Sequence, residues 1–245
     1  MGDKEELLTK KEGELLQSKI GQILWIARQS RPDVIFDASN LASSLKKANI
    51  QTLNEANKII KNLKSETITL KFKKLGNDNA IRLLVFSDSS LGNLSDGGTQ
   101  GGHFIVFVGE NGLFSPITWQ SKRIRVARST LAAETLAMAD AIDSGIFVAS
   151  LYTELMYGKA DPTQLPITCL TDCHSLWEAI KSTKQVSEKR LRLEISSIRE
   201  LIQMHQIVSV KWIETKHQLA DCLTKLEALK SLCRSPVFTD ALEIM

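Results

Sequence analysis

Four acidic residues occupy positions from which a mixed α/β chain can direct side chains to one shared point. Asp88 and Asp172 each follow an apolar run typical of a strand, and Glu134 and Asp221 each lie early in a segment with helical periodicity. Carboxylates that converge repel one another unless a cation lies among them, and the usual cation is a pair of Mg²⁺ ions, with Mn²⁺ as a substitute. The four residues therefore predict metal-dependent phosphodiester chemistry.

The positions of these residues matter more than their types, because acidic residues are common at turns and on solvated helices. In an open α/β sheet, ligand sites lie beyond the ends of strands, where Asp88 and Asp172 are expected. Glu134 stands between apolar neighbours such as Leu131 and Leu136, and burial of a Glu without a cation is costly. A metal cluster resolves that cost.

The elements that must position these residues form two groups. Residues 1–13 are charged and expected to be flexible, and residues 14–75 form a helical segment that ends at a turn near 76–79. Thr52 to Glu55 follow a capping-box pattern that is expected to open the third helix. The segment is expected to contain helices 14–28, 34–45 and 52–64 and a connecting strand 67–73.

From residue 80 onward the pattern changes to alternating strands and helices. Asn111-Gly112 is a strong signal for a hairpin between the second and third strands. Residues 80–230 are predicted to form one α/β domain, and residues 231–245 a C-terminal tail. The expected order βββαβααβα has strands at 81–88, 103–109, 113–120, 167–171 and 207–214, and helices at 129–157, 174–183, 187–204 and from about 218.

The charge of the chain is unevenly distributed. The net charge is only +3, but residues 1–75 carry 14 Lys and Arg against 9 Asp and Glu, and residues 76–245 carry 17 against 19. A basic flank beside an acidic centre suits a protein that holds a phosphate backbone. No apolar stretch reaches membrane-spanning length and the N-terminus does not resemble a signal peptide, which favours an intracellular, cytoplasmic or nuclear protein without a membrane partner.

The cysteines allow a second interpretation of the site. Cys169, Cys173 and His174 form a cluster with the spacing of zinc ligands. The other two cysteines, Cys222 and Cys233, do not supply the second pair that a structural zinc site needs. Reduced thiols of an intracellular protein are the simpler interpretation.

Two basic clusters and several polar residues are candidates for contacts with nucleic acid, although a charge run can also be only a solvated face. We expect Asn93, Gln100 and Gln120 to lie on loops near the carboxylates. Trp119, Trp177 and Trp212 are expected in the core rather than as stacking surfaces, because each lies in an apolar pattern. The full set of candidate contacts is Asn93, Gln100, Gln120, Lys122, Arg123, Arg125, Arg128, Ser175, Lys184, Lys189 and Arg190.

Four motifs in order carry a family resemblance. They are Phe86-Ser87-Asp88-Ser89-Ser90-Leu91-Gly92-Asn93, Ala127-Arg128-Ser129-Thr130-Leu131-Ala132-Ala133-Glu134, Thr171-Asp172-Cys173-His174-Ser175-Leu176 and Gln218-Leu219-Ala220-Asp221-Cys222-Leu223-Thr224-Lys225. Over about residues 80–230 the chain resembles the ribonuclease H domain of copia-type retrotransposon pol polyproteins. Residues 20–65 resemble the thumb and connection of the reverse transcriptase in those elements, and the sequence contains no Tyr-x-Asp-Asp polymerase motif. The chain thus resembles the C-terminal end of such a polyprotein.

The resemblance implies a ribonuclease H-like fold with a five-stranded mixed sheet, and an Mg²⁺-dependent endonuclease that cuts the RNA strand of RNA–DNA hybrids. Asp88 then bridges two metal ions, Asp221 completes the site that activates water, and Glu134 and Asp172 hold the metal on the leaving side. The polymerase part of a reverse transcriptase is an implied partner. Cellular relatives carry a catalytic His on a longer loop, and His217, four residues before Asp221, is either its substitute or a plain surface residue.

A second hypothesis is a non-catalytic nucleic-acid-binding or connection fragment of a degenerate or host-retained retroelement. The absence of a polymerase motif motivates it, and retention of all four carboxylates argues against it. The two hypotheses differ in whether a bound hybrid is cut.

Overall fold

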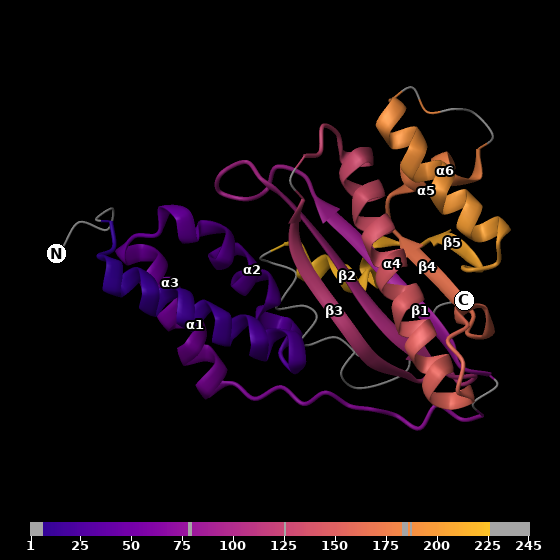
Figure 1. Cartoon of the computed structure of the whole chain (residues 1–245), viewed down its shortest axis with the longest axis horizontal. Helices are drawn as coiled ribbons and strands as arrows, with labels where there is room; N and C mark the ends of the chain where they lie inside the picture. Colours follow the sequence, from indigo (N-terminus) through magenta and orange to yellow (C-terminus); the bar gives the residue numbers. More distant parts are fainter. Residues whose placement is uncertain (1–6, 78–79, 125, 183–185, 187, 226–245) are drawn as a thin grey trace.

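A computed structural model describes residues 7–77, 80–124, 126–182, 186 and 188–225. A helical module at the N-terminus is followed by a sheet with helices packed on it (Figure 1). The predicted tail 231–245 lies outside the described residues. In the described part of the chain, no helix combines the length and apolar content needed to cross a membrane.

The helical module contains α1 (Lys10–Gln29), α2 (Ile35–Ser44) and α3 (Ile50–Ser65). Helix α1 begins earlier than predicted because Thr9 and Glu12 form a capping box, each side chain accepting a hydrogen bond from the backbone N–H of the other. The N-cap of α3 is Asn49, and Thr52 occupies the third helical position of its capping box. The prediction that Thr52 opens this helix was wrong, because the Asn49 side chain already accepts from the Thr52 N–H.

Residues 67–73, predicted as a connecting strand, are extended but do not join the sheet ladder. The segment runs along one margin of the sheet (Figure 1), where the Lys73 N–H donates to Ser115 Oγ at 2.9 Å and the Ser115 hydroxyl donates back to the Lys73 carbonyl at 3.2 Å. A side chain therefore takes the place of backbone pairing. The approach is close enough that a Cβ on Gly109 would lie 1.9 Å from the Leu75 carbonyl oxygen.

The sheet has five strands in the order β3-β2-β1-β4-β5. Its strands are β1 (Arg82–Ser90), β2 (Thr99–Val108), β3 (Phe114–Ile124), β4 (Ile167–Thr171) and β5 (Ser209–Trp212). The β1–β2 and β2–β3 pairs are antiparallel, and the β1–β4 and β4–β5 pairs are parallel. The predicted α/β fold with a five-stranded mixed sheet is confirmed. The predicted hairpin is also present, with Gly112 at a φ of 70° between β2 and β3.

Strand β2 begins at Thr99, earlier than the predicted residue 103. Gly101 pairs with Ser89 and Gly102 pairs with Asp88, so the part of β1 that carries Asp88 is paired with β2. Glycines in succession favour a loop by propensity, and here tertiary packing overrides that preference because neighbouring chain segments approach too closely for a side chain.

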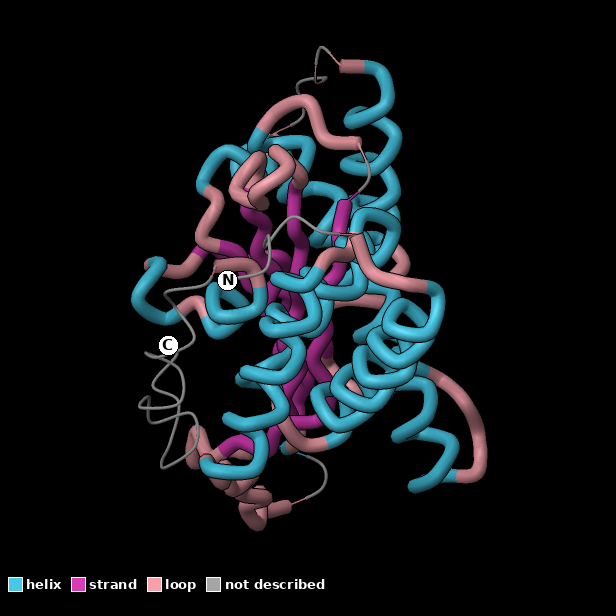
Figure 2. The backbone as a smooth tube through the Cα atoms, turned by 90° about the vertical axis from the view of Figure 1, so that its left-hand side faces the viewer, coloured by secondary structure: helices cyan, strands magenta, loops and turns pink. Residues whose placement is uncertain are grey.

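Helices α4 (Thr130–Tyr157), α5 (His174–Lys181) and α6 (Lys189–Gln203) cover one face of the sheet and share its core. The other face carries α1, α2 and the short 3-10 helix η6 (Leu219–Leu223), which share a second core with β1, β2 and β3. Figure 2 shows the strands enclosed between these helices. Helix α4 stops at Gly158 as predicted, with a φ of 72°. Of the predicted final helix, the described residues form only η6.

Candidate metal centre

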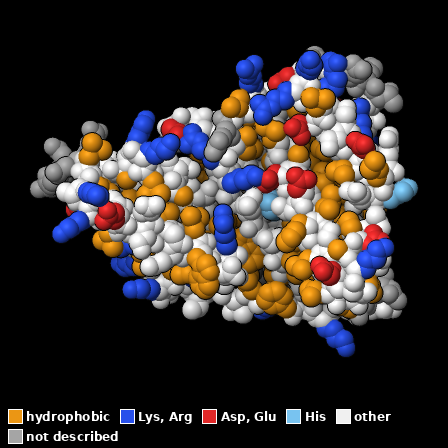
Figure 3. All heavy atoms as spheres, in the orientation of Figure 1, with side chains coloured by type: hydrophobic (Ala, Val, Ile, Leu, Met, Phe, Trp, Pro, Cys, Tyr) orange, Lys and Arg blue, Asp and Glu red, His pale blue; other side chains and the backbone are white. Residues whose placement is uncertain are grey.

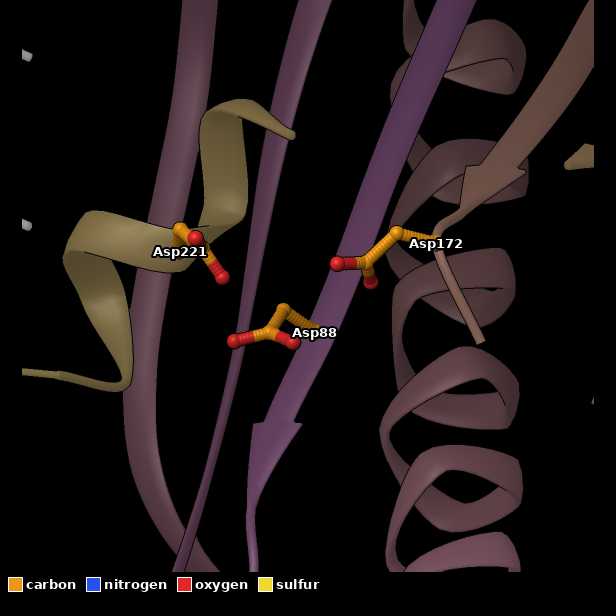
Figure 4. A group of neighbouring side chains, drawn as sticks. All are labelled: Asp88, Asp172 and Asp221. Carbon is orange, nitrogen blue, oxygen red and sulfur yellow. The ribbon is translucent and has the colours of Figure 1, made fainter. Parts of the chain in front are cut away.

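Three aspartates converge near the C-terminal ends of β1 and β4. Asp88 lies in β1, Asp172 follows β4 and Asp221 lies in η6, and one ligand oxygen from each lies within 4.8 Å of the others. Figure 4 shows the three side chains pointing toward one another. Parallel pairing of β1 with β4 brings the ends of these strands together, as the position of Asp88 and Asp172 after apolar runs predicted.

Helix η6 lies beside these aspartates because two hydrogen bonds hold it against the strands and one glycine lets it approach closely. The Gln218 amide donates to the Ser87 carbonyl at 3.0 Å, and the Ser121 hydroxyl donates to the Leu223 carbonyl at 2.5 Å. A Cβ on Gly102 would lie 2.7 Å from the Leu223 Cβ and 3.1 Å from a backbone carbonyl. Asp221 therefore arrives beside Asp88 through packing that no local pattern in the sequence shows.

Glu134 lies next to this group but outside it. It is buried in the first turns of α4, and its Oε1 accepts the Ser89 N–H at 3.2 Å. Within the described residues its Oε2 is buried without a hydrogen-bond partner. Unpaired buried carboxylate oxygens are rare, so this atom marks a position that a cation or a water molecule can fill.

Burial and mutual repulsion alter the acidity of two of these groups. Burial, with smaller contributions from Asp221 and Asp172, raises the pKa of Asp88 to about 7 against the opposing pull of Lys225 and Thr224. Burial first and Asp88 second raise the pKa of Glu134 to about 8. Asp88 near the end of β1 and Glu134 in α4 are therefore candidates for a functional site.

Two residues next to Asp221 already contact the aspartates. The Thr224 hydroxyl donates a short hydrogen bond to Asp88 Oδ2. The Lys225 ammonium nitrogen lies 2.5 Å from Asp221 Oδ1 and 3.7 Å from Asp88 Oδ2. Both residues belong to the fourth sequence motif but received no role there, although Lys225 stands four residues after Asp221, the spacing of a helical ion pair.

The donor set fits a hard divalent cation. Carboxylate oxygens are the ligands that Mg²⁺ and Mn²⁺ prefer, and three of them lie within 4.8 Å of one another, which is close enough to bind one ion. Among the described residues, the metal-ligating group contains the three aspartates and none of the cysteines. Cys169 and Cys222 are buried, and burial raises the pKa of the Cys169 thiol to about 12. Cys233 lies outside the described residues. The geometry thus favours oxygen ligands over the alternative of a zinc site.

His217 lies apart from the aspartate group. It is exposed in the 3-10 helix η5 (Thr215–His217), beside the surface ion pair of Lys216 with Glu214. In the described part of the chain, the cluster of metal-ligating side chains consists of the three aspartates without it.

The polar candidates differ in their access to solvent. Gln100 and Gln120 lie in strands rather than on loops, so that expectation was wrong. Gln100 is fully buried, and its amide donates to Ser39 of the helical module at 3.0 Å and to Ser121 at 2.7 Å. Asn93 is exposed after β1, as expected, and donates to Ser90.

Two of the five described basic candidates form ion pairs with acidic residues. Lys122 pairs with Asp140, and Arg123 with Asp96 at 2.6 Å. Lys and Arg side chains gather at the top of Figure 3, near the N-terminal end of α6. A cavity there is lined by Arg128, Lys189 and Arg190 together with apolar and acidic side chains. Arg125 and Lys184 lie outside the described residues, and Ser175 is exposed at the start of α5.

The tryptophans divide between core and surface. Trp119 is buried as predicted, but Trp212 is 43% exposed, so its assignment to the core was wrong. Trp212 lies in the edge strand β5, and its indole N–H donates to the Asp172 carbonyl at 3.0 Å. The centroid of the His174 ring lies 6.1 Å from that of the Trp212 ring and 5.3 Å from that of the half-buried Trp177 ring. Sequence periodicity missed this aromatic surface because it does not distinguish edge strands from central ones.

No protein-family model matches the sequence. A putative transposon Ty5-1 protein of Saccharomyces cerevisiae is 28% identical over 111 residues, which are 44% of this chain and 33% of that protein. The chain therefore spans about a third of the length of the curated relative that it matches.

Several solved structures resemble the chain at low sequence identity. LC11-RNase H1, isolated from compost by a metagenomic approach, has a TM-score of 0.43 at 14% identity, covering 61% of this chain and 96% of its own. RNase H1 from Halobacterium salinarum has a TM-score of 0.42 at 18% identity and covers 61% and 98%. The foamy viral protease-reverse transcriptase in complex with an RNA/DNA hybrid has a TM-score of 0.48 at 16% identity and covers 85% and 27%. The chain thus has an α/β architecture with a five-stranded mixed sheet and, at low identity, is similar in sequence to a Ty5-type transposon protein.

Proposed function

We propose that this chain is a ribonuclease H-type endonuclease that hydrolyses the RNA strand of RNA–DNA hybrids with the help of divalent metal ions. The observation that carries the proposal is the convergence of Asp88, Asp172 and Asp221 within 4.8 Å, with the unpaired Oε2 of buried Glu134 beside them. Carboxylates arranged in this way are stable in ionised form only with a cation. The four motifs that carry the resemblance to copia-type ribonuclease H domains contain these same four residues.

The residues of the chain have separate tasks in this proposal. Asp88, Asp172 and Asp221 hold Mg²⁺ or Mn²⁺, and Glu134 supplies a further carboxylate from the α4 side. The bound ions supply Lewis acidity, which makes water a better nucleophile and stabilises charge on the leaving oxygen. Hydrolysis joins the water oxygen to phosphorus and breaks the bond to the 3′ oxygen, which leaves a 3′ hydroxyl and a 5′ phosphate.

Substrate binding is assigned to two surfaces of the chain. Arg128, Lys189 and Arg190 offer positive charge to the phosphate backbone, which positions the substrate without reading its sequence. The exposed rings of His174 and Trp212 offer a stacking or sugar-packing surface next to Asp172. A polymerase part of a reverse transcriptase is the proposed partner in the intact element.

The decisive experiment incubates the protein with a labelled RNA–DNA hybrid, with and without Mg²⁺. We expect cleavage of the RNA strand only with metal, and its loss in Asp88→Asn. Asp161→Asn is a matched control, because Asp161 is a distant helix cap whose role Asn can fill. Absence of metal-dependent cleavage in the wild type would reject the nuclease.

A second candidate is a non-catalytic hybrid-binding fragment. One observation favours it: Thr224 and Lys225 bind oxygens of Asp88 and Asp221 that a metal ion would need. This candidate predicts salt-sensitive binding of the hybrid and no cleavage at any metal concentration.

A further inference from the structure

We propose that Lys225 is a built-in counter-ion of the metal-free centre, and that a divalent cation must displace its ammonium group from Asp221 and Asp88. The inference rests on the proposed metal site and adds a residue that competes with the metal. Lys225 thereby sets the metal concentration at which the centre fills.

The contacts of Lys225 place its charge on atoms that a metal needs. Its nitrogen lies 2.5 Å from Asp221 Oδ1 and 3.7 Å from Asp88 Oδ2. Both aspartates belong to the group whose ligand atoms lie within 4.8 Å of one another. A divalent cation bound to the same two carboxylates would stand close to the ammonium group, and the two positive charges would repel each other.

The ammonium group is also able to leave. The Lys225 side chain is 38% exposed, whereas that of Asp88 is 3% exposed, so the lysine reaches the buried carboxylate from the solvent side. Its four-carbon stem is flexible and its ammonium is strongly hydrated in water, which makes withdrawal feasible. Asp88 lies in β1, Asp221 lies in η6 and Asp172 directly follows β4, and their shorter side chains cannot withdraw in the same manner.

One lysine cannot neutralise the whole centre. When all three aspartates are ionised, one ammonium group leaves an excess of two negative charges among them, which equals the charge of one divalent cation. Lys225 thus reduces the repulsion among these carboxylates, and the remaining negative charge still favours binding of a metal ion. Removal of its charge is expected to lower the stability of the metal-free protein and to raise its affinity for a metal ion.

The experiment compares Mn²⁺ and Mg²⁺ binding by calorimetry in the wild type and in Lys225→Met, which keeps the stem and removes the charge. We expect roughly tenfold tighter metal binding in the variant, a lower melting temperature without metal, and a larger rise in melting temperature on metal addition. Lys216→Met is the matched control, because Lys216 forms an exposed ion pair with Glu214. This control is expected to bind metal as the wild type does.

The result that would overturn the inference is a Lys225→Met protein that binds metal no more tightly than the wild type. Wild-type protein that binds no metal would instead reject the proposed function itself, so the two failures are distinguishable. If Lys225→Met does not fold, NMR of the side-chain ammonium in the wild type provides the test. Its signal should move to that of a free lysine as Mg²⁺ is added, and an unchanged signal at saturation would contradict displacement.

Discussion

The indole N–H of Trp119 donates a 2.8 Å hydrogen bond to the carbonyl of Ala27, and this bond joins the sheet to the helical module. Ala27 lies in the last turn of α1, where carbonyl groups have no partner within the helix. Trp119 therefore supplies a hydrogen-bond donor to the C-terminal end of α1. Its ring stacks on that of Phe104, with 5.8 Å between the ring centroids. The module and the sheet share one apolar core around this contact.

Replacement of Trp119 by Phe should therefore destabilise the whole chain. The change leaves a buried carbonyl unpaired, which costs about 1–3 kcal/mol of the free energy of unfolding in urea. Trp25→Phe is the control, because Trp25 is 67% exposed on the same helix, and it should change this free energy by less than about 0.5 kcal/mol. Two separate transitions, with only one shifted by the substitution, would contradict a shared core.

Gly102→Ala should disrupt the centre without changing any carboxylate. The new methyl group meets the Leu223 Cβ at 2.7 Å and a backbone carbonyl at 3.1 Å, so η6 must move and carry Asp221 away from Asp88. We expect weaker Mn²⁺ binding, by roughly tenfold or more, when measured by calorimetry. Gly101→Ala is the control, because its methyl group meets mainly the flexible end of Ile124. Equal metal affinity in the two variants would refute this role of Gly102.

The metal-free protein should lose stability as pH rises, and Glu134 should cause part of the loss. Its pKa is about 8 in the folded protein against an ordinary value of 4.5, so the folded state binds the extra proton between these values. The contribution of Glu134 is full below pH 4.5 and disappears as pH rises through about 8. The unfolding free energy of the wild type should fall relative to Glu134→Gln, by up to about 1 kcal/mol per pH unit in this range.

Denaturant titrations of both proteins in a chelator, at several pH values, measure this difference. His103, whose pKa burial lowers to about 4, acts with the opposite sign below about pH 6.5, but it is present in both proteins and cancels. A difference that stays constant from pH 5 to pH 8 would show that Glu134 ionises normally. Saturating Mg²⁺ should reduce the slope, because a metal favours the ionised carboxylate.

Trp212→Ala should weaken hybrid binding by roughly tenfold if the exposed ring packs on the substrate. The measurement uses fluorescence anisotropy in the Asp88→Asn background, where cleavage does not interfere. Trp212→Phe separates two roles, because Phe retains an aromatic surface and loses the hydrogen bond to the Asp172 carbonyl. We expect Phe to bind nearly as the wild type, whereas Phe147→Ala, at an exposed position on α4, should have no effect. Equal losses for Phe and Ala at position 212 would assign Trp212 to the support of Asp172 alone.

The sequence by itself determined most of the strands and helices, because apolar periodicity and turn residues act locally. The hairpin at Asn111-Gly112, the stop of α4 at Gly158 and the strand-end positions of Asp88 and Asp172 all follow from such patterns. The four motifs also indicated that Asp221 belongs with these aspartates, although its local pattern predicted a helix where the described residues form the shorter η6.

Only the tertiary structure decided which side chains meet and which face solvent. The approach of η6 over Gly102, the contact of Lys225 with Asp221, and the unpaired oxygen of Glu134 depend on segments far apart in the chain. Trp212 is exposed because β5 is an edge strand, which is a property of strand order rather than of local sequence. Burial, which sets the acidity of Asp88 and Glu134, likewise depends on what packs against a residue rather than on its neighbours in the sequence.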